Sequence, residues 1–333
     1  MKTGKLHSDI LEKLLQDIKI SDDVIIGPWV GVDSAVVRVS NDIVIVASDP
    51  ITFTTDNIGY YSVCVNINDI AVAGALPRFF LATVLLPPSS SESDAQNVIN
   101  QIKIECEKWN ISLIGGHTEF TESVNSLIVN GCMIGFPIGE KIYSSAGVNV
   151  GDDLVLVGSI AYEGCSIIAT HYEEKLIEIG VDKKIIHTAQ NYIKNPGICI
   201  LKYAIQAVKS ANISAMHDPT EGGIANAIYE MAKASNVGFI IDKYAIEITK
   251  EADIICKNMN IDPLGLISSG CLLVSVDSSD TQKLIKSYNS NDITAGVIGR
   301  AVDVSLGVKY SNGEKVAEFE RDEIARIFEE IQV

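Results

Sequence analysis

Four aspartates stand where a predicted strand or turn meets glycine or a helix. Asp33 lies in GVDSAVV, Asp49 ends the strand-like IVIVASD, Asp69 lies in NINDIAVAGA, and Asp218 lies in MHDPTEGG. Carboxylates placed in this way can hold Mg²⁺, which prefers hard oxygen ligands and shares the rest of its coordination with phosphate and water. An aspartate before a helix is also an ordinary N-cap, so each position alone leaves both roles open.

Asp69 has the greatest need of a partner. It is embedded in an apolar run with Val65, Ile67 and Ile70, where an unpaired charge would be costly. Asn66 precedes it by three residues and therefore lies on the same face of a helix.

Two pairs of glycines could bring backbone close to an anion. Gly222 and Gly223 open a predicted helix after an Asp-Pro-Thr turn, and free N–H groups at a helix start favour phosphate; a plain turn with a cap explains them equally well. The stretch LIGGHTEF (113–120) is a strand that runs into two glycines and then into polar residues. It is either a site or a polar turn.

Several common sites are excluded by their missing motifs. The sequence has no GxxxxGK[ST], no GxGxxG after its first strand, and neither GxSxG nor HExxH, so a P-loop, a Rossmann cofactor site, a hydrolase elbow and a zincin site are not expected. The net charge of −17 argues against a nucleic-acid partner. Seven single, widely spaced cysteines argue against a disulfide framework or a metal cluster.

The hydrophobic pattern alternates strands and helices throughout, which predicts an α/β or α+β class. Helices are expected over residues 6–18, 58–75, 91–109, 163–178 and 183–209, after Gly222, and at the C-terminal end. Strands are expected at AVVRV, DIVIVASD, RFFLATVLL, LIGG, SLIVNGCMIGF, DLVLVGS, NISAM, SGCLLVSVD and ITAGVIGR.

The length of 333 residues predicts two domains, with a boundary near residue 148 at the glycine-punctuated SSAGVNVGDD. The domains are therefore expected at 1–148 and 149–333. The N-terminal stretch lacks a signal-peptide core, and no segment has about 18 uninterrupted apolar residues. We expect a cytoplasmic protein with no membrane partner.

Five segments in this order and spacing resemble the superfamily of aminoimidazole ribonucleotide (AIR) synthetase, the PurM-like fold. They are GVDSAVV, ASDPITF, VNINDIAVAGALPRFFLATVLLP, LIGGHTEF and HDPTEGG. The sequence is most similar to the HypE-like AIR synthase-related group, whose wider family includes selenophosphate synthetase and thiamine-monophosphate kinase. The resemblance implies a PurM-like N-terminal domain that pairs in a homodimer to form a β-barrel, and a PurM-like α+β C-terminal domain. It also implies ATP and Mg²⁺ as cofactors.

The resemblance assigns roles residue by residue. The family's metal-binding carboxylates match Asp33, Asp49, Asp69 and Asp218. Its nucleotide-facing loop matches Gly115, Gly116, His117, Thr118 and Glu119. Asn66 belongs to the phosphate-facing segment, and Lys5 matches the end of a glycine-rich N-terminal segment. Gly222 and Gly223 remain expected phosphate contacts from their own helix-start pattern. His117 and Glu119 are expected to act on the phosphate or the acceptor.

The sequence also departs from its relatives. HypE ends in a tail whose cysteine carries a carbamoyl group, whereas this chain ends ARIFEEIQV; we expect that another protein would have to supply the thiol. Thiamine-phosphate kinases commonly show Gly-Gly-Asp-Thr where this chain has Gly-Gly-His-Thr.

The first hypothesis is an ATP-dependent phosphoryl-transfer or ligase-type enzyme that phosphorylates a carbonyl-type oxygen of a small molecule or of a partner's carboxamide. The alternatives are a non-catalytic nucleotide-binding assembly factor related to hydrogenase maturation, and a thiamine-monophosphate-type kinase.

Overall fold

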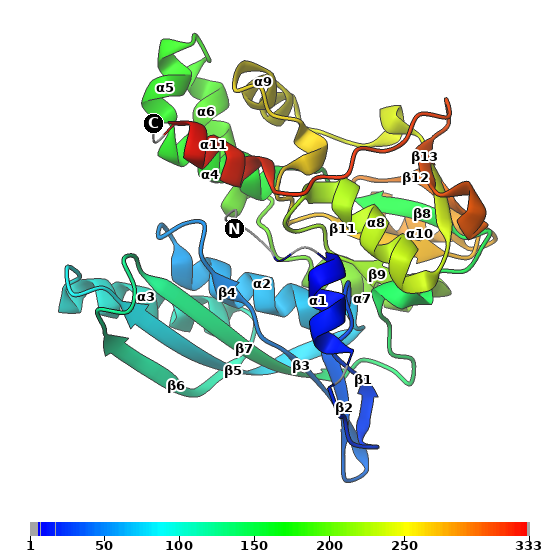
Figure 1. Cartoon of the computed structure of the whole chain (residues 1–333), viewed down its shortest axis with the longest axis horizontal. Helices are drawn as coiled ribbons and strands as arrows, with labels where there is room; N and C mark the ends of the chain where they lie inside the picture. Colours follow the sequence, from blue (N-terminus) through cyan, green and yellow to red (C-terminus); the bar gives the residue numbers. More distant parts are fainter. Residues whose placement is uncertain (1–5, 7, 17, 332–333) are drawn as a thin grey trace. The chain divides into compact units, whose positions relative to one another are not determined.

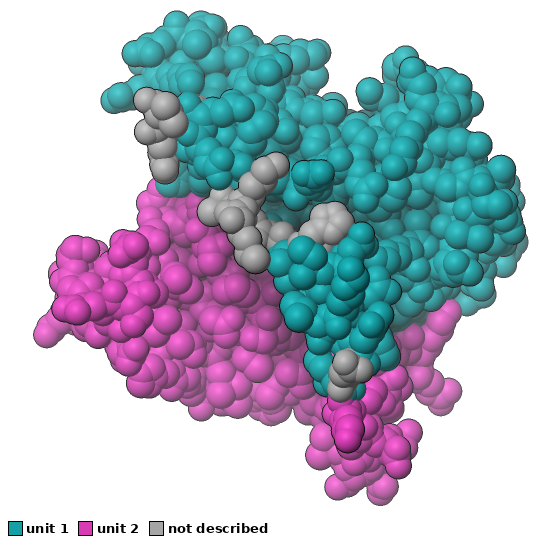
Figure 2. Space-filling view, in the orientation of Figure 1, with its two compact units in different colours: residues 1–18, 29–32, 143–333 teal, residues 19–28, 33–142 magenta. Residues whose placement is uncertain are grey.

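The computed structural model describes residues 6, 8–16 and 18–331, which form two compact units. Unit 1 comprises the described residues of 1–18, 29–32 and 143–333, and unit 2 comprises residues 19–28 and 33–142 (Figure 2). Lys5, assigned above to a phosphate, lies outside the described residues.

Unit 2 contains a seven-stranded sheet and two helices. Its elements are β1 (Val24–Ile26), β2 (Ala35–Val39), β3 (Asp42–Ala47), β4 (Pro50–Ile51), α2 (Ile58–Val72), β5 (Ala75–Leu86), α3 (Glu92–Lys108), β6 (Ser112–Phe120) and β7 (Ile128–Pro137). The strand order is β1-β2-β3-β7-β5-β6, and β4 pairs with β7. Only β5 and β6 are parallel, as α3 makes the crossover between them.

Both helices of unit 2 form where the sequence predicts them. α2 is buried over almost its whole length because its residues are small or apolar. α3 begins with a capping box in which the Ser91 hydroxyl accepts from the N–H of Asp94 while the Asp94 carboxylate accepts from the N–H of Ser91. The two helices pack together on one face of the sheet (Figure 1).

The opposite face of this sheet is apolar and half-exposed. Along β5 and β7 the residues that face α2 are buried, and the alternate residues are only partly covered. The partly covered set includes Phe79, Leu81, Leu85, Cys132, Ile134 and Phe136. Unit 2 thus contributes helices to one side of its sheet and leaves the other side open.

The structure corrects the reading of LIGGHTEF as a strand that ends at two glycines. β6 continues through them to Phe120 and pairs with β5 from Phe79↔Ser112 to Leu86↔Phe120, with a bulge at Phe80/Leu81. Gly116 has φ +143°, and a Cβ there would lie 1.9 Å from the carbonyl oxygen of Ala82. The glycine therefore permits close strand pairing and does not open a loop.

Unit 1 contains a six-stranded sheet in the order β13-β10-β12-β8-β11-β9, in which only β10 and β13 are parallel. Its strands are β8 (Asp153–Val157), β9 (Ile213–His217), β10 (Gly238–Ile241), β11 (Leu272–Val276), β12 (Ala295–Val302) and β13 (Val308–Tyr310). Its α-helices are α1 (Ser8–Leu15), α4 (Tyr162–His171), α5 (Glu173–Glu178), α6 (Lys183–Gln190), α7 (Leu201–Ser210), α8 (Gly223–Ser235), α9 (Lys250–Asn258), α10 (Thr281–Asn289) and α11 (Glu323–Ile331).

Short 3-10 turns complete unit 1. They are η1 (Ser145–Gly147), η2 (Asn191–Ile193), η3 (Lys243–Ala245), η4 (Pro263–Gly265) and η5 (Val304–Leu306). The strands expected in this half are present as β8, β9, β11 and β12, whereas β10, α9, α10 and β13 are not predicted from the sequence.

Two long helices expected in unit 1 are each broken. The helix expected over 163–178 divides into α4 and α5 at Tyr172, and that over 183–209 divides into α6 and α7. Pro196 has no N–H to donate, and Gly197 adopts φ +88°, so the chain cannot continue as a helix through this point. Across the described residues, no helix combines the length and the hydrophobicity that a membrane span requires.

Candidate functional site

The side chain of Asn66, in the middle of α2, forms hydrogen bonds to the backbone that follows β3. Its Oδ1 accepts from the backbone N–H of Asp49 at 3.1 Å, and its Nδ2 donates to the carbonyl oxygen of Asp49 at 3.2 Å and to that of Ser62 at 2.9 Å. The Asn66 side chain is fully buried. Its two N–H groups are therefore used inside the protein, and its effect is to position Asp49.

Gly131 of β7 completes this arrangement. A Cβ at Gly131 would lie 2.4 Å from the Asn66 Nδ2, so the glycine makes room for the amide. Gly131 also donates its N–H to the Asp49 carbonyl at 3.0 Å and accepts from the Ser48 hydroxyl at 2.8 Å. Hydrogen bonds from two elements thus hold the backbone of Asp49.

Asp69 lies one helical turn after Asn66 and is 5% exposed. Its neighbours Ile67 and Ile70 are fully buried, so a cation would offset the cost of its charge. Asp33, which is partly exposed, precedes β2 in the same unit. Asp33, Asp49 and Asp69 each offer carboxylate oxygens, which are the type of ligand that Mg²⁺ prefers.

His117 and Glu119 form a pair on one face of β6, a strand whose residues are all exposed. The His117 Nε2 and the Glu119 Oε2 are 3.0 Å apart, and both side chains are about half-exposed or more, at 63% and 47%. Residues two apart on a strand share a face, so Thr118 and Gly116 belong to the other face. The structure therefore divides the five residues of 115–119 between two faces of one edge strand.

Unit 1 holds a buried polar group at the end of β9. His217 and Asp218 are 2% and 1% exposed. The His217 Nε2 lies 2.8 Å from the Oε2 of Glu230, which comes from α8. The contact fixes which ring nitrogen faces the carboxylate, and so it orients His217 beside Asp218.

The amides of the Gly222-Gly223 turn have partners within the chain. Gly222 donates to the Asp322 Oδ2 at 2.6 Å, and Gly223 donates to the carbonyl oxygen of Thr220 at 3.0 Å. Both glycines have positive φ (+81° and +62°), and a Cβ at either would meet Asn226 or the backbone of Leu264. Turn geometry and packing account for both glycines, and a carboxylate takes the place expected for phosphate at Gly222.

Asp322 links this turn to the C-terminal helix. Its Oδ1 accepts from the N–H of Ile324 at 2.8 Å, in the first turn of α11, while its Oδ2 accepts from Gly222. Burial raises the pKa of Asp322 to about 7, and the nearby carboxylate of Glu221 raises it further, while the three backbone N–H groups of Ile324, Gly222 and Ile267 act in the opposite direction.

A cavity of about 670 Å³ lies beside this turn within unit 1. It lies between α1, the Val30–Gly31 segment, α8 and the 318–322 segment. Six acidic residues line it, namely Asp9, Glu221, Glu230, Glu318, Glu320 and Asp322, against the basic residues Lys233 and Arg321. Lys233 is itself paired with Glu12 at 2.8 Å and Asp9 at 3.4 Å. Such a lining disfavours a triphosphate and favours a neutral or cationic ligand.

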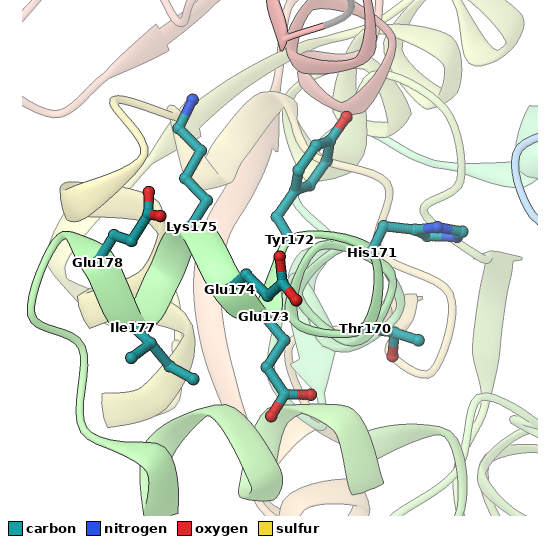
Figure 3. Close-up of a pocket in the computed structure, with 8 residues that line it drawn as sticks. All are labelled: Thr170, His171, Tyr172, Glu173, Glu174, Lys175, Ile177 and Glu178. Atoms are coloured by element: carbon teal, nitrogen blue, oxygen red, sulfur yellow. The ribbon is translucent and has the colours of Figure 1, made fainter.

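A second hollow of about 620 Å³ lies over α4 and α5 and is lined by residues 170–175, 177 and 178. Its side chains point away from one another (Figure 3). Because its polar groups do not converge, it is not a candidate for ligand binding.

Comparison with known proteins places both units in one family. Residues 31–136 match the N-terminal domain of AIR synthase related proteins, and residues 149–311 match the C-terminal domain of the same proteins. The chain belongs to the AIR synthase related family. The two matches together cover most of its length, as the five sequence segments indicated.

Individual relatives of this AIR synthase related chain agree with that placement. A hydrogenase expression/formation protein of Methanocaldococcus jannaschii is 26% identical over 324 residues, covering 92% of this chain and 93% of its own. The carbamoyl dehydratase HypE of Cupriavidus necator is 24% identical over 249 residues, covering 73% and 67%. The crystal structure of the hydrogenase maturation protein HypE in complex with ATP shares the fold, with a TM-score of 0.70 at 17% identity over 95% of this chain and 91% of that one.

Sequence reasoning did not find the two partners that organise unit 1. Glu230 and Asp322 are ordinary acidic residues in charged segments, and their partners His217 and Gly222 lie 13 and 100 residues away. The sequence contains no local signal for either contact.

Proposed function

We propose that this chain is a Mg²⁺-dependent ATP-binding enzyme that phosphorylates a carbonyl-type oxygen. The observation that carries the proposal is the pair of hydrogen bonds between the Asn66 side chain and the Asp49 backbone. Asn66 lies one helical turn before the buried Asp69. These hydrogen bonds hold the Asp49 backbone against the helix that carries Asp69, and both residues could supply hard-oxygen ligands. A HypE relative solved with ATP and relatives described as carbamoyl dehydratases support the choice of nucleotide and of a carboxamide-type acceptor.

In this proposal Asp33, Asp49 and Asp69 of unit 2 hold the metal. Bound Mg²⁺ would offset the charge of the triphosphate against these carboxylates and stabilise the negative charge that develops on the transferred phosphoryl group. Asn66 keeps the Asp49 backbone in place. The exposed His117–Glu119 pair supplies polar groups for the phosphate or the acceptor.

We also propose that the enzyme is a homodimer. The open face of the unit 2 sheet presents Leu81, Ile134 and Phe136, and β6 is an edge strand whose nine residues are all exposed. A long, exposed and partly apolar edge is normally covered in a stable protein. A second copy that packs sheet against sheet would cover both features. A cytoplasmic location, as expected from the sequence, is part of the same proposal.

Release of ADP from Mg-ATP tests the enzyme, with primary carboxamides and other small acceptors added in turn. The proposal predicts ADP release that stops when EDTA removes the metal. Micromolar ATP binding without ADP release under every condition would contradict it and would favour a nucleotide-binding assembly factor.

A further inference from the structure

The acidic cavity of unit 1, of about 670 Å³, is shaped by contacts within that unit. The Asn226 side chain, in α8, donates to the carbonyl oxygen of Phe319 at 2.8 Å and accepts from the Phe319 N–H at 3.0 Å. The Tyr229 hydroxyl, also in α8, donates to the carbonyl oxygen of Val316 at 2.8 Å. These bonds hold the 316–322 segment along α8. The chain itself therefore forms a cavity whose volume is that of a small-molecule site.

α1 supplies another wall of this cavity and is joined to α8 through Lys233. The Lys233 Nζ lies 2.8 Å from the Glu12 Oε2 and 3.4 Å from the Asp9 Oδ1. A Cβ at Gly31 would lie 3.4 Å from the Cβ of Glu230, so this segment also packs closely on α8. An ammonium group of the chain thus already pairs with a carboxylate that lines the cavity.

The carboxylates of the cavity differ in their exposure. Asp322 is 2% exposed, and the Glu230 side chain is 22% exposed. The side chains of Glu318 and Asp9 are 57% and 68% exposed. Negative groups therefore lie both at the buried end of the cavity and at its rim. Burial raises the pKa of the Asp322 carboxyl, and the nearby Glu221 raises it further, so a cation in the cavity would offset that repulsion.

The remaining lining and the spacing of the charges indicate the kind of cation. The apolar side chains of the lining are Leu6, Leu11, Val30 and Phe319, and such walls suit a methylene chain. A bare metal ion is a poorer match, because within the described part of the chain no three carboxylates of this cavity bring oxygens within 4.8 Å of one another. An anion would be repelled by the six acidic residues. An elongated organic cation fits both the apolar walls and the separated charges.

We propose that the acidic cavity of unit 1 binds an aliphatic diammonium ion, with one ammonium group at the buried carboxylates and the other at the rim. Each ammonium group has three N–H donors and no acceptor, so it pairs with carboxylate oxygens as Lys233 pairs with Glu12 and Asp9. The methylene chain between the two groups lies along the apolar walls. The site lies in unit 1 and requires neither ATP nor Mg²⁺, so the inference goes beyond the proposed function.

Calorimetric titration of 1,4-diaminobutane into the full chain tests the site, in a metal-free buffer of fixed ionic strength without ATP. The matched ligand is n-butylammonium, which has the same methylene chain length and a single charge. We expect saturable binding of one 1,4-diaminobutane per chain, at least about tenfold tighter than n-butylammonium, because the second ammonium group then binds intramolecularly. Absence of saturable binding, or equal affinity for the two amines, would overturn the inference.

A double variant, Glu221→Gln with Glu320→Gln, locates the site. Both residues line the cavity, Glu221 partly buried and Glu320 exposed. The control, Glu107→Gln with Glu122→Gln, removes two charges from exposed positions of unit 2. We expect the cavity variant to bind 1,4-diaminobutane at least about tenfold more weakly and the control to keep wild-type affinity. Equal weakening in both would show attraction to the net charge of −17, and wild-type affinity in the cavity variant would place binding elsewhere; either result contradicts the site.

Hydrogen exchange gives a second readout of the location. Binding of 1,4-diaminobutane should slow the exchange of backbone N–H groups in the 316–322 segment and leave those of β6, in unit 2, unchanged. Saturable binding without slower exchange in the 316–322 segment would refute the assignment to this cavity. The outcome is separate from that of the proposed function, because an absence of ADP release from Mg-ATP leaves the diammonium site standing, and failure of the amine titration leaves the unit 2 aspartates untested.

Discussion

Replacing Asn66 by alanine tests how unit 2 positions its carboxylates. The change removes the acceptor of the Asp49 N–H and the donors to the carbonyl oxygens of Asp49 and Ser62. The Asp49 carbonyl keeps the Gly131 N–H at 3.0 Å, and the Ser62 carbonyl keeps its helical partner, so one buried N–H is left without a partner. That group costs about 1–3 kcal/mol. With the small cavity left by the side chain, the free energy of unfolding should fall by about 2–4 kcal/mol.

The assay is urea unfolding of Asn66→Ala together with calorimetric binding of Mg-ATP. Gly131→Ala gives an independent test, because its Cβ would displace the Asn66 amide without removing any hydrogen-bonding group. Cys132→Ala is the matched control, since this neighbour points to the opposite face of β7. We expect the first two variants to weaken Mg-ATP binding at least tenfold and the control to leave it unchanged. Asn66→Ala with wild-type stability and wild-type affinity would refute the reasoning.

Three further predictions concern other parts of the molecule. Gly116→Ala should destabilise unit 2 by about 2–4 kcal/mol, because its Cβ would lie 1.9 Å from the Ala82 carbonyl. Gly115→Ala is the comparison, because a Cβ at Gly115 has open space around it. Equal losses of unfolding free energy in the two variants would argue against the clash. Leu81→Lys, on the open face of the unit 2 sheet, should convert a species of twice 35.9 kDa into one near 35.9 kDa in sedimentation; a wild-type monomer would contradict the dimer. Because burial raises the pKa of folded Glu163 from 4.5 to about 7, wild type should lose stability relative to Glu163→Gln as the pH rises from about 4.5 to about 7, by up to about 3 kcal/mol. Denaturant unfolding at pH 5 and pH 8 measures that difference, and a pH-independent difference would exclude the raised pKa.

Much of the fold could be predicted from local sequence patterns. The small, apolar run after Ile58 predicts a buried α2, and Ser91 followed by Asp94 predicts the capped start of α3, and the structure has both. The broken helix near Pro196 was missed because the flanking segments keep a helical pattern on both sides of the break. The family was also readable from the sequence, since five short segments in register carry it.

Long-range contacts account for what the sequence did not reveal. Two glycines in LIGGHTEF suggest a turn, and only the approach of the Ala82 backbone shows why the strand needs Gly116. The sequence predicts that the N–H of Gly222 contacts phosphate, but in the structure it donates to the carboxylate of Asp322, which comes 100 residues later. Glu163 is buried next to Ala161, whose N–H donates to the Ser268 hydroxyl more than 100 residues later. No local pattern encodes such pairings.

The central claim is that the unit 2 aspartates bind ATP through Mg²⁺, and calorimetric titration of ATP into Asp69→Asn tests it most directly. Asparagine keeps the size of the buried side chain but removes the charge that the metal requires. We predict that wild type binds ATP in the presence of Mg²⁺ and loses that binding with EDTA, and that Asp69→Asn, folded as judged by its thermal unfolding, shows no Mg²⁺-dependent binding. Normal Mg²⁺-dependent binding of ATP by Asp69→Asn would contradict the account.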